Sequence, residues 1–442
     1  MKDYIKIVFK FGIVVLLSIF STFILNKYLW KEYSIDLFEE NMSYNLKYKG
    51  IIDSTDFTFD ENNNCYISYN NRVQVVEENG KSYDILKNEN LNIYSMEYYC
   101  GSLFFVSNNY LYKFEIDNKE LTEIMKDLPN YGDYNKSIIK QSEGFLYITI
   151  GAATNSGVVG KDNLWTREYP FNHDLTPYKI NLRGINHGES KTGAFVNENS
   201  KSVEGQIVPA HFPGNASVII YNLETGDRTT FAWGIRNIKG LDFNSRSQLL
   251  ASVGGMENRG ERPIKGDSDY IYEIKSKNWY GWPDFSGGDP ISSPRFTDGE
   301  GKMVFPVLDN HPNENPPAPI YQSDNINEIN CLAIDKWGTL GEIDGIYFYD
   351  NCKKSIYLLN FDLVLKKIVE INNNDKIQSI KFYKNGLYVM DSKNGILYSI
   401  HIVEKGTINR MNYKMIFSFI VTLVFILIFY LAWTSRKYRK LK

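Results

Sequence analysis

Residues 345–350 read GIYFYD and residues 355–360 read SIYLLN, two short strands rich in aromatic and apolar side chains on either side of a turn. The same unit recurs along the chain, with strands that begin near residues 65, 102, 145, 248, 346 and 387. Short strands repeated at roughly 40 to 50 residues are typical of propeller blades. The repeat therefore predicts an all-β fold, a six-bladed β-propeller, rather than a pair of β-sandwiches.

The regular spacing is interrupted twice, by residues 151–216 and by residues 281–329. These two stretches hold much of the Pro, Gly and His of the chain. Long insertions in propellers lie on a rim and commonly build the binding face. We therefore expect both insertions to lie beside the functional site.

The composition narrows the classes of partner. The 442 residues include 49 Lys and Arg against 52 Asp and Glu, and 15% of the side chains are aromatic. A formal net charge of −3 does not favour nucleic acid as a partner. The aromatic content excludes a disordered chain, and four cysteines exclude a disulfide scaffold.

Residues 415–433 read MIFSFIVTLVFILIFYLAW, a run of 19 residues without a charge. As a helix, this run is about 28 Å long, close to the thickness of the hydrocarbon core of a bilayer. Residues 434–442 follow with five Lys and Arg, which the positive-inside rule places in the cytoplasm. We expect a C-terminal transmembrane helix and a basic cytoplasmic tail.

A second apolar run lies within residues 8–30, near the positive charges of Lys2, Lys6 and Lys10. A secretory signal peptide has the same pattern, but no A-x-A-like cleavage site follows. We expect an uncleaved N-terminal transmembrane anchor here. Both termini are then cytoplasmic, and residues 34–412 form an extracytoplasmic propeller at the cell membrane.

More specific motifs lie within residues 127–320. The runs are residues 128–133 (LPNYGD), 151–160 (GAATNSGVVG), 192–196 (TGAFV), 233–241 (WGIRNIKGL), 259–263 (RGERP) and 279–288 (WYGWPDFSGG). In order and spacing they resemble the soluble quinoprotein sugar dehydrogenases, the glucose/sorbosone dehydrogenase family. Members of this family are six-bladed propellers that use pyrroloquinoline quinone (PQQ) and calcium. The resemblance implies both cofactors, a sugar substrate and, for an active enzyme, a membrane electron acceptor.

The resemblance also implies roles for individual residues. Arg236 and Asn237 match the quinone-binding pair of the family, and Gly255 matches the loop that holds the calcium ion of the cofactor. Asp269 and Tyr280 match positions near the structural calcium ion. Structural alternatives stay open, since Arg236 could pair with a carboxylate, Asp269 could be a surface acid and Tyr280 could serve packing.

Two elements of the family's site are altered. Tyr134 stands where the family has its catalytic His, and Asp133 is the nearest acid. Loss of a general base lowers a rate by about 10²- to 10⁴-fold. Residues 252–255 read SVGG and lack the side-chain oxygens of the family's cofactor loop. The insertions contain three candidate replacement bases, His173, His211 and His311.

Three functions remain as hypotheses. The first is an active quinoprotein aldose dehydrogenase that passes electrons to a membrane acceptor. The second is a degenerate member that keeps the propeller and binds a carbohydrate, a glycan or a protein. The third is the scaffold of a membrane complex. Because function resides in the site rather than in the fold, and two elements of this site are altered, the sequence favours the second hypothesis.

Overall fold

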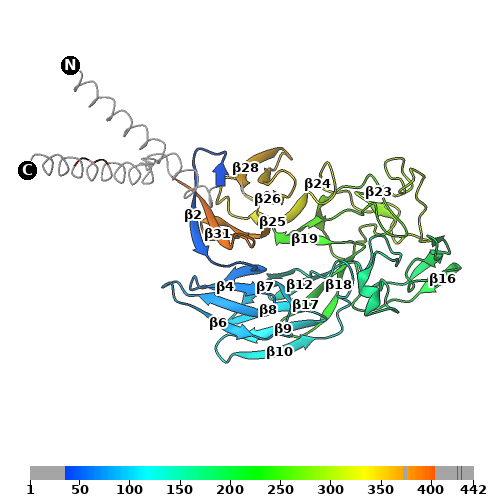
Figure 1. Cartoon of the computed structure of the whole chain (residues 1–442), viewed down its shortest axis with the longest axis horizontal. Helices are drawn as coiled ribbons and strands as arrows, with labels where there is room; N and C mark the ends of the chain where they lie inside the picture. The colour runs from blue at the N-terminus through cyan, green and yellow to red at the C-terminus, as the bar shows by residue number, and fades with distance from the viewer. Residues whose placement is uncertain (1–34, 372–375, 404–425, 427–429, 431–442) are drawn as a thin grey trace, which may run out of the picture. The chain divides into compact units, whose positions relative to one another are not determined.

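The computed structural model describes these parts of the chain: residues 35–371, 376–403, 426 and 430 (Figure 1). The chain forms two compact units. The smaller unit includes the short strand β1 (Ile35–Leu37). The larger unit comprises residues 42–370 and 374–402 and contains the propeller.

The predicted membrane segments fall largely outside this description. The anchor at residues 8–30 and the tail at residues 434–442 lie outside the described residues, as does all but two residues of the span at residues 415–433. Within the described ranges, no helix is long and apolar enough to cross a bilayer.

Six antiparallel sheets form the blades of the larger unit, with four of its strands in each (Figure 1). From the innermost strand outward, blade 1 contains β3 (Asp56–Phe59), β4 (Cys65–Tyr69), β5 (Arg72–Val76) and β6 (Ser82–Lys87). Blade 2 contains β7 (Ile93–Tyr99), β8 (Ser102–Ser107), β9 (Tyr110–Glu115) and β10 (Glu120–Met125). Blade 3 contains β11 (Ile139–Ser142), β12 (Phe145–Ile150), β17 (Ser217–Asn222) and β18 (Arg228–Trp233). Blade 4 contains β19 (Ile238–Phe243), β20 (Leu249–Val253), β21 (Tyr270–Ile274) and β24 (Tyr321–Gln322). Blade 5 contains β25 (Ile329–Asp335), β26 (Gly345–Asp350), β27 (Ser355–Leu359) and β28 (Leu365–Ile371). Blade 6 contains β29 (Ile377–Tyr383), β30 (Gly386–Asp391), β31 (Ile396–Ile402) and β2 (Met42–Lys49). The predicted all-β, six-bladed propeller is confirmed.

The blades close into a ring. Each innermost strand contacts the innermost strands of the two neighbouring blades, in the order β3, β7, β11, β19, β25, β29 and back to β3. The early strand β2 pairs with the late strand β31, from Met42 opposite Ile402 to Lys49 opposite Ile396. This pairing completes blade 6 with a strand from the other end of the unit and covers the edge of β31.

Neighbouring blades pack face to face on apolar side chains. Every residue of β8, which reads SLFFVS, is buried. Strands covered on both faces read as continuous apolar runs rather than as alternating ones. Val73, Ile93 and Phe105 meet without exposed surface in one cluster between blades 1 and 2. The core is therefore a set of apolar layers between blades.

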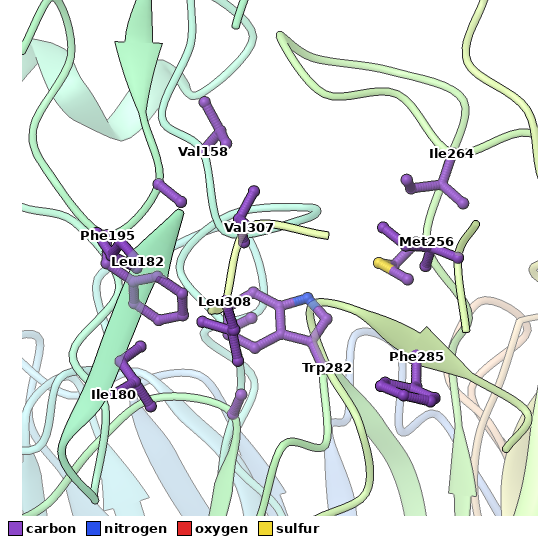
Figure 2. Packing of buried hydrophobic residues seen from close by; sticks show 14 of the residues in the cluster. Val158, Ile180, Leu182, Phe195, Met256, Ile264, Trp282, Phe285, Val307 and Leu308 are labelled. Atoms are coloured by element: carbon purple, nitrogen blue, oxygen red, sulfur yellow. The ribbon is translucent and has the colours of Figure 1, made fainter. Parts of the chain in front are cut away.

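Both predicted insertions leave the blade pattern where expected. The first lies between β12 and β17 and contains the 3-10 helix η1 (Leu164–Arg167) and the strands β13 (Ile180–Arg183), β14 (Asn186–His187), β15 (Thr192–Gly193) and β16 (Glu204–Val208). The second lies between β21 and β24 and contains β22 (Phe285–Ser286) and β23 (Asp289–Pro290). Together the insertions enclose another apolar core, where the rings of Phe195 and Trp282 lie 5.8 Å apart (Figure 2).

A buried ion pair ties the insertions together. Arg262 Nη2 donates to Asp284 Oδ1 at 2.8 Å, and both side chains are buried. Arg262 Nη1 also donates to Ser156 O in the first insertion at 2.8 Å. In the second insertion, the Asp284 carboxylate accepts hydrogen bonds from Val307 N and Leu308 N. One guanidinium and one carboxylate thus connect three loops.

We expect Asp284→Ala to lower the free energy of unfolding by about 3 to 5 kcal/mol, because the substitution leaves the buried Arg262 guanidinium without its partner. Asp289→Ala is the matched control, since Asp289 pairs with Arg295 at the surface and such pairs contribute about 0 to 1 kcal/mol. Denaturant unfolding followed by tryptophan fluorescence measures both effects. Equal effects would show that the buried pair does not hold the insertions together.

Candidate functional site

One face of the propeller, which we call the upper face, carries the loops that lead into the innermost strands. Tyr134 precedes β11, Arg236 and Asn237 precede β19, and Gly255 follows β20. In an antiparallel pair, the start of one strand and the end of the next lie at the same edge. Consistent with this, Gly254 N donates to Asn237 O at 2.8 Å. The topology therefore gathers the predicted base and cofactor-binding residues on one face.

Arg236 is buried, with 4% of its side chain exposed, and it faces protein acceptors. Its Nε donates to Asn155 O at 3.1 Å. Its Nη1 donates to Gly254 O at 3.2 Å and to Gly255 O. Burial lowers the pKa of the guanidinium to about 10, although the nearby Glu257 carboxylate opposes this shift.

The Tyr134 hydroxyl bridges two guanidinium groups. Arg236 Nη2 and Arg259 Nη2 both donate to it, the latter at 2.8 Å. The hydroxyl donates in turn to Glu257 Oε1 at 3.1 Å, and the same oxygen accepts from Arg236 Nη2 at 2.9 Å. The Arg236 guanidinium also lies 4.0 Å from the centroid of the Tyr134 ring. The phenol is thus fixed as a hydrogen-bond bridge.

Arg259 brings further carboxylates into contact. It donates to Asp162 Oδ2 at 2.6 Å, to Asp133 Oδ2 at 2.8 Å and to Glu257 Oε2 at 2.7 Å. Burial opposes the positive charge of Arg259, but hydrogen bonds to Glu257 and Asp133 outweigh burial and raise its pKa. Asp133 also accepts from Trp165 Nε1 at 2.9 Å. We call the following residues the arginine cluster: Asp133, Tyr134, Asp162, Arg236, Glu257 and Arg259.

The first insertion supports the cluster through Asn155. Its Oδ1 accepts from Arg236 Nη2 and from Glu257 N, at 2.9 and 2.8 Å. Asp174 holds the preceding loop, because its carboxylate accepts from Ala153 N at 2.6 Å. Asp174 is fully buried, and burial raises its pKa to about 7 despite this hydrogen bond.

Protein groups contact both predicted calcium-binding residues. The buried Asp269 carboxylate accepts from Lys239 Nζ at 2.9 Å and from Ile329 N at 3.0 Å. The Tyr280 hydroxyl donates to Glu273 O at 2.6 Å. Among the residues that the structure describes, no group of three or more His, Cys, Asp and Glu side chains is arranged to hold a metal ion. The calcium roles of Asp269 and Tyr280 stay predictions.

The insertion histidines have other neighbours. His173 Nδ1 and His211 Nδ1 lie beside backbone carbonyl oxygens, at 3.3 and 2.9 Å. His311 Nε2 lies 3.2 Å from Asp284 Oδ2, within the core that the insertions share. These contacts give no support to a replacement base at Tyr134.

The donor set of the arginine cluster does not fit PQQ with calcium. In the family-like arrangement, Arg236 would donate to quinone oxygens and the loop at Gly255 would hold the ion. Here the guanidinium and the Gly255 carbonyl oxygen satisfy each other. The loop is also tight, since a Cβ atom on Gly255 would lie 2.0 Å from Ser268 O. A quinone would have to displace several hydrogen bonds of a buried cation.

A polar cavity of about 420 Å³ opens on the upper face, lined by blades 1, 2, 3 and 6, and we call it the upper cavity. Asn135, directly after Tyr134 in the chain, is one of its lining residues. Six side-chain amides line it: Asn70, Asn92, Asn108, Asn130, Asn135 and Gln378. An amide both donates and accepts hydrogen bonds, so this lining suits a ligand rich in hydroxyl groups.

Two lysines give the upper cavity positive charge. Lys136 and Lys376 line it, and no described carboxylate forms an ion pair with either one. Burial, and then the charge of Lys376, lower the pKa of Lys136. Asp53 is the acid among the described lining residues. The buried Ser54 Oγ also lies in the lining and has no hydrogen-bond partner in the described structure.

Sequence reasoning found Tyr134, Asp133, Arg236 and Gly255 but missed Asp162, Glu257 and Arg259. Arg259 opens the RGERP motif, which signalled the resemblance without indicating what the side chain contacts. The upper cavity was missed as well. Its only sequence signal is the recurrence of Asn next to the strands of several blades.

The raised pKa of Asp174 makes stability depend on pH. An Asp side chain in the unfolded chain has a pKa near 3.9. In the folded protein, burial raises the pKa of Asp174 to about 7, so the carboxyl group stays largely protonated below that pH. Folding stability from this group therefore falls as pH rises from about 4 to 7 and stays reduced above 7.

We expect the stability of the Asp174→Asn variant not to fall in this way, because Asn does not ionise. The unfolding free energy of the variant minus that of the unsubstituted chain should therefore increase from pH 4 to 7 and then level off. Denaturant titrations across this range measure the difference. Asp117→Asn, at an exposed position, is the control for a change of charge alone. A difference that does not vary with pH would contradict the raised pKa.

In sequence, no protein-family model and no curated protein matches the chain. In structure, a family AA12 carbohydrate-active enzyme of Trichoderma reesei is similar, with a TM-score of 0.58 at 13% identity over 84% of this chain and 98% of that one. The holo PQQ domain of pyranose dehydrogenase from Coprinopsis cinerea gives 0.56 at 10% identity, over 84% and 97%. The apo soluble aldose sugar dehydrogenase of Escherichia coli gives 0.52 at 11% identity, over 82% and 99%.

These similarities extend well beyond residues 127–320, where the motifs lie. They confirm, at the level of the fold, the resemblance to quinoprotein sugar dehydrogenases. Identities of 10 to 13% carry no argument about individual site residues. The chain has the six-bladed propeller fold that PQQ-dependent sugar dehydrogenases share.

Proposed function

We propose that the chain is a membrane-anchored, extracytoplasmic binding protein whose propeller holds an anionic saccharide in the upper cavity without quinone chemistry. The observation that carries this proposal is the contrast between two parts of one face. The arginine cluster satisfies its own charges within the protein. The upper cavity beside it is open and polar, and among the described residues no carboxylate pairs with the two lysines that line it.

The hydrogen bonds within the arginine cluster argue against quinone redox chemistry at this site. A general base must reach the proton that it removes and must have a free acceptor. The Tyr134 hydroxyl already accepts from two guanidinium groups and donates to Glu257. The guanidinium nitrogens of Arg236 already donate to protein oxygens. Both groups would have to leave these partners before they could act on a sugar or a quinone.

The upper cavity supports saccharide binding. Its volume of about 420 Å³ lies within the usual range of ligand sites, about 300 to 1,000 Å³. The Tyr94 ring in its lining lies 5.2 Å from Lys136 Nζ and offers an apolar face next to the charge. A lysine ammonium binds carboxylate or phosphate as a point charge, so the class of ligand is a saccharide with an acidic group.

A second candidate function is oxidation of an aldose with PQQ and calcium, followed by electron transfer to a membrane acceptor. One observation favours it, the fold shared with the holo pyranose dehydrogenase domain and with the PQQ-bound aldose sugar dehydrogenase of Streptomyces coelicolor. This function requires the arginine cluster to open and release Arg236. The two candidates therefore differ in a single measurable property, the binding of the quinone.

The first test mixes the purified full-length chain with PQQ and saturating calcium and measures uptake by absorbance and calorimetry. We expect no stoichiometric binding and no oxidation of aldoses with an artificial electron acceptor, because Arg236 is engaged within the protein. Tight binding that Arg236→Ala abolishes would establish the dehydrogenase instead. Arg246→Ala, at an exposed position, serves as the matched control.

The second test measures the binding of acidic and neutral oligosaccharides of equal length by calorimetry. We expect the acidic ligands to bind at least about tenfold more tightly, because a hydrogen bond to a charged group contributes about 1.5 to 3 kcal/mol and 1.4 kcal/mol is tenfold. Lys136→Met should remove most of this preference and leave the neutral ligands unaffected.

Lys161→Met is the control for the second test. Lys161 lies in the first insertion and pairs with Glu189 at the surface, so its loss should not change the affinity. Equal binding of acidic and neutral ligands would contradict the role of the lysines. Absence of any saccharide binding would contradict the function itself.

A further inference from the structure

The face opposite the upper face, which we call the lower face, carries a cluster of exposed apolar side chains on blade 5. Five residues form this lower apolar patch: Trp337 (80% exposed), Ile343 (66%), Phe361 (85%), Leu363 (57%) and Val364 (57%). The first two lie in the turn between β25 and β26, and the others in the turn between β27 and β28. These turns are neighbours, since Ile346 pairs with Leu359 where the turns begin and end.

The patch belongs to a continuous, hydrogen-bonded face. The turn that holds Ile343 contacts blade 4, where Ser245 Oγ donates to Asp344 Oδ2 at 2.7 Å. The same turn contacts blade 6, where Thr339 Oγ1 donates to Lys384 O at 3.4 Å. The apolar side chains are therefore presented from a supported surface rather than from a free loop. Large exposed apolar side chains gathered on neighbouring turns are typical of an interaction site.

The larger unit begins and ends on the lower face. Met42 pairs with Ile402 at one end of the β2–β31 ladder. The opposite end of β31 adjoins the β30–β31 turn, and Ser392 of that turn lines the upper cavity. The first and last residues of the unit therefore lie at the face that carries the patch.

The connections to the predicted membrane segments are short. Eleven residues, 31–41, separate the predicted anchor at residues 8–30 from the propeller, and twelve, 403–414, separate the propeller from the predicted span at residues 415–433. Twelve fully extended residues reach about 40 Å at most. Two short connections from one face direct that face toward the bilayer.

We propose that the lower apolar patch inserts into the lipid surface of the membrane that carries the chain. The proposal rests on the membrane attachment in the proposed function and is independent of the saccharide site. Trp337 and Phe361 have the side chains that favour the boundary between headgroups and acyl chains. Asp362 lies between Phe361 and Leu363 in the sequence, and its charge limits insertion to this boundary.

Attachment at two spans keeps the patch close to lipid. The effective lipid concentration at the patch is high, because the connections are short and insertion is intramolecular. A few side chains therefore suffice to bind the surface. Insertion at blade 5 adds a third point of attachment and fixes the propeller with its upper cavity directed away from the membrane.

The test measures the depth of single labels on the full-length chain in lipid vesicles. Cys65 and Cys331 are buried, whereas Cys100 and Cys352 are exposed, so Cys100→Ser with Cys352→Ser gives an unreactive background. A fluorophore on Phe361→Cys is then quenched by nitroxide-bearing lipids. The matched control is Phe171→Cys, because Phe171 lies in the first insertion and is 79% exposed.

We expect several-fold stronger quenching at position 361 than at position 171, with the same result for a label on Trp337→Cys. Flotation of the vesicles tests attachment separately. If the chain floats but positions 361 and 171 are quenched equally, the inference is wrong and the anchoring stands. If the chain does not float with vesicles, both fail. Saccharide affinity, measured on the same preparations, reports the upper cavity independently.

Discussion

Backbone hydrogen bonds between β2 and β31 join the two ends of the larger unit and close the ring of six blades. Without this pairing, blade 6 would lose its outer strand and β31 would become its exposed edge. Closure holds the upper loops of blades 1, 2, 3 and 6 around one cavity. It also returns both ends of the unit to the lower face. The upper cavity and the exit of both ends of the unit on the lower face therefore depend on the same strand pair.

The second constraint is the burial of the Arg236 guanidinium. A buried cation needs hydrogen-bond acceptors, and an unsatisfied one is costly. In a quinone site, the ligand supplies part of this need. Here Tyr134, Glu257 and Asn155 supply it from the protein. Tyr134, which stands where the resembling family has His, is therefore one part of a self-satisfied network.

Much of the fold could be predicted from sequence, because blade strands such as SLFFVS at residues 102–107 are apolar and recur at regular spacing. The order of the motifs also predicted that Tyr134, Arg236 and Gly255 share one site. The contacts of Glu257 and Arg259 could not be predicted, since they join loops about a hundred residues apart in the chain. The upper cavity and the lower apolar patch are assembled from separate loops and turns. Closure of the ring brings these loops and turns together, and no local periodicity in the sequence indicates their placement.

The geometry of the closing pair has a mechanical consequence. Met42 and Ile402 are partners at the same end of an antiparallel ladder, and the chain leaves the propeller from both. In the proposed membrane attachment, a lateral force that separates the two spans would act on this end and load the hydrogen-bonded pairs one after another, rather than all together as in shear. Tension in the plane of the membrane would thus release β2 first, while the other five blades keep all four of their strands.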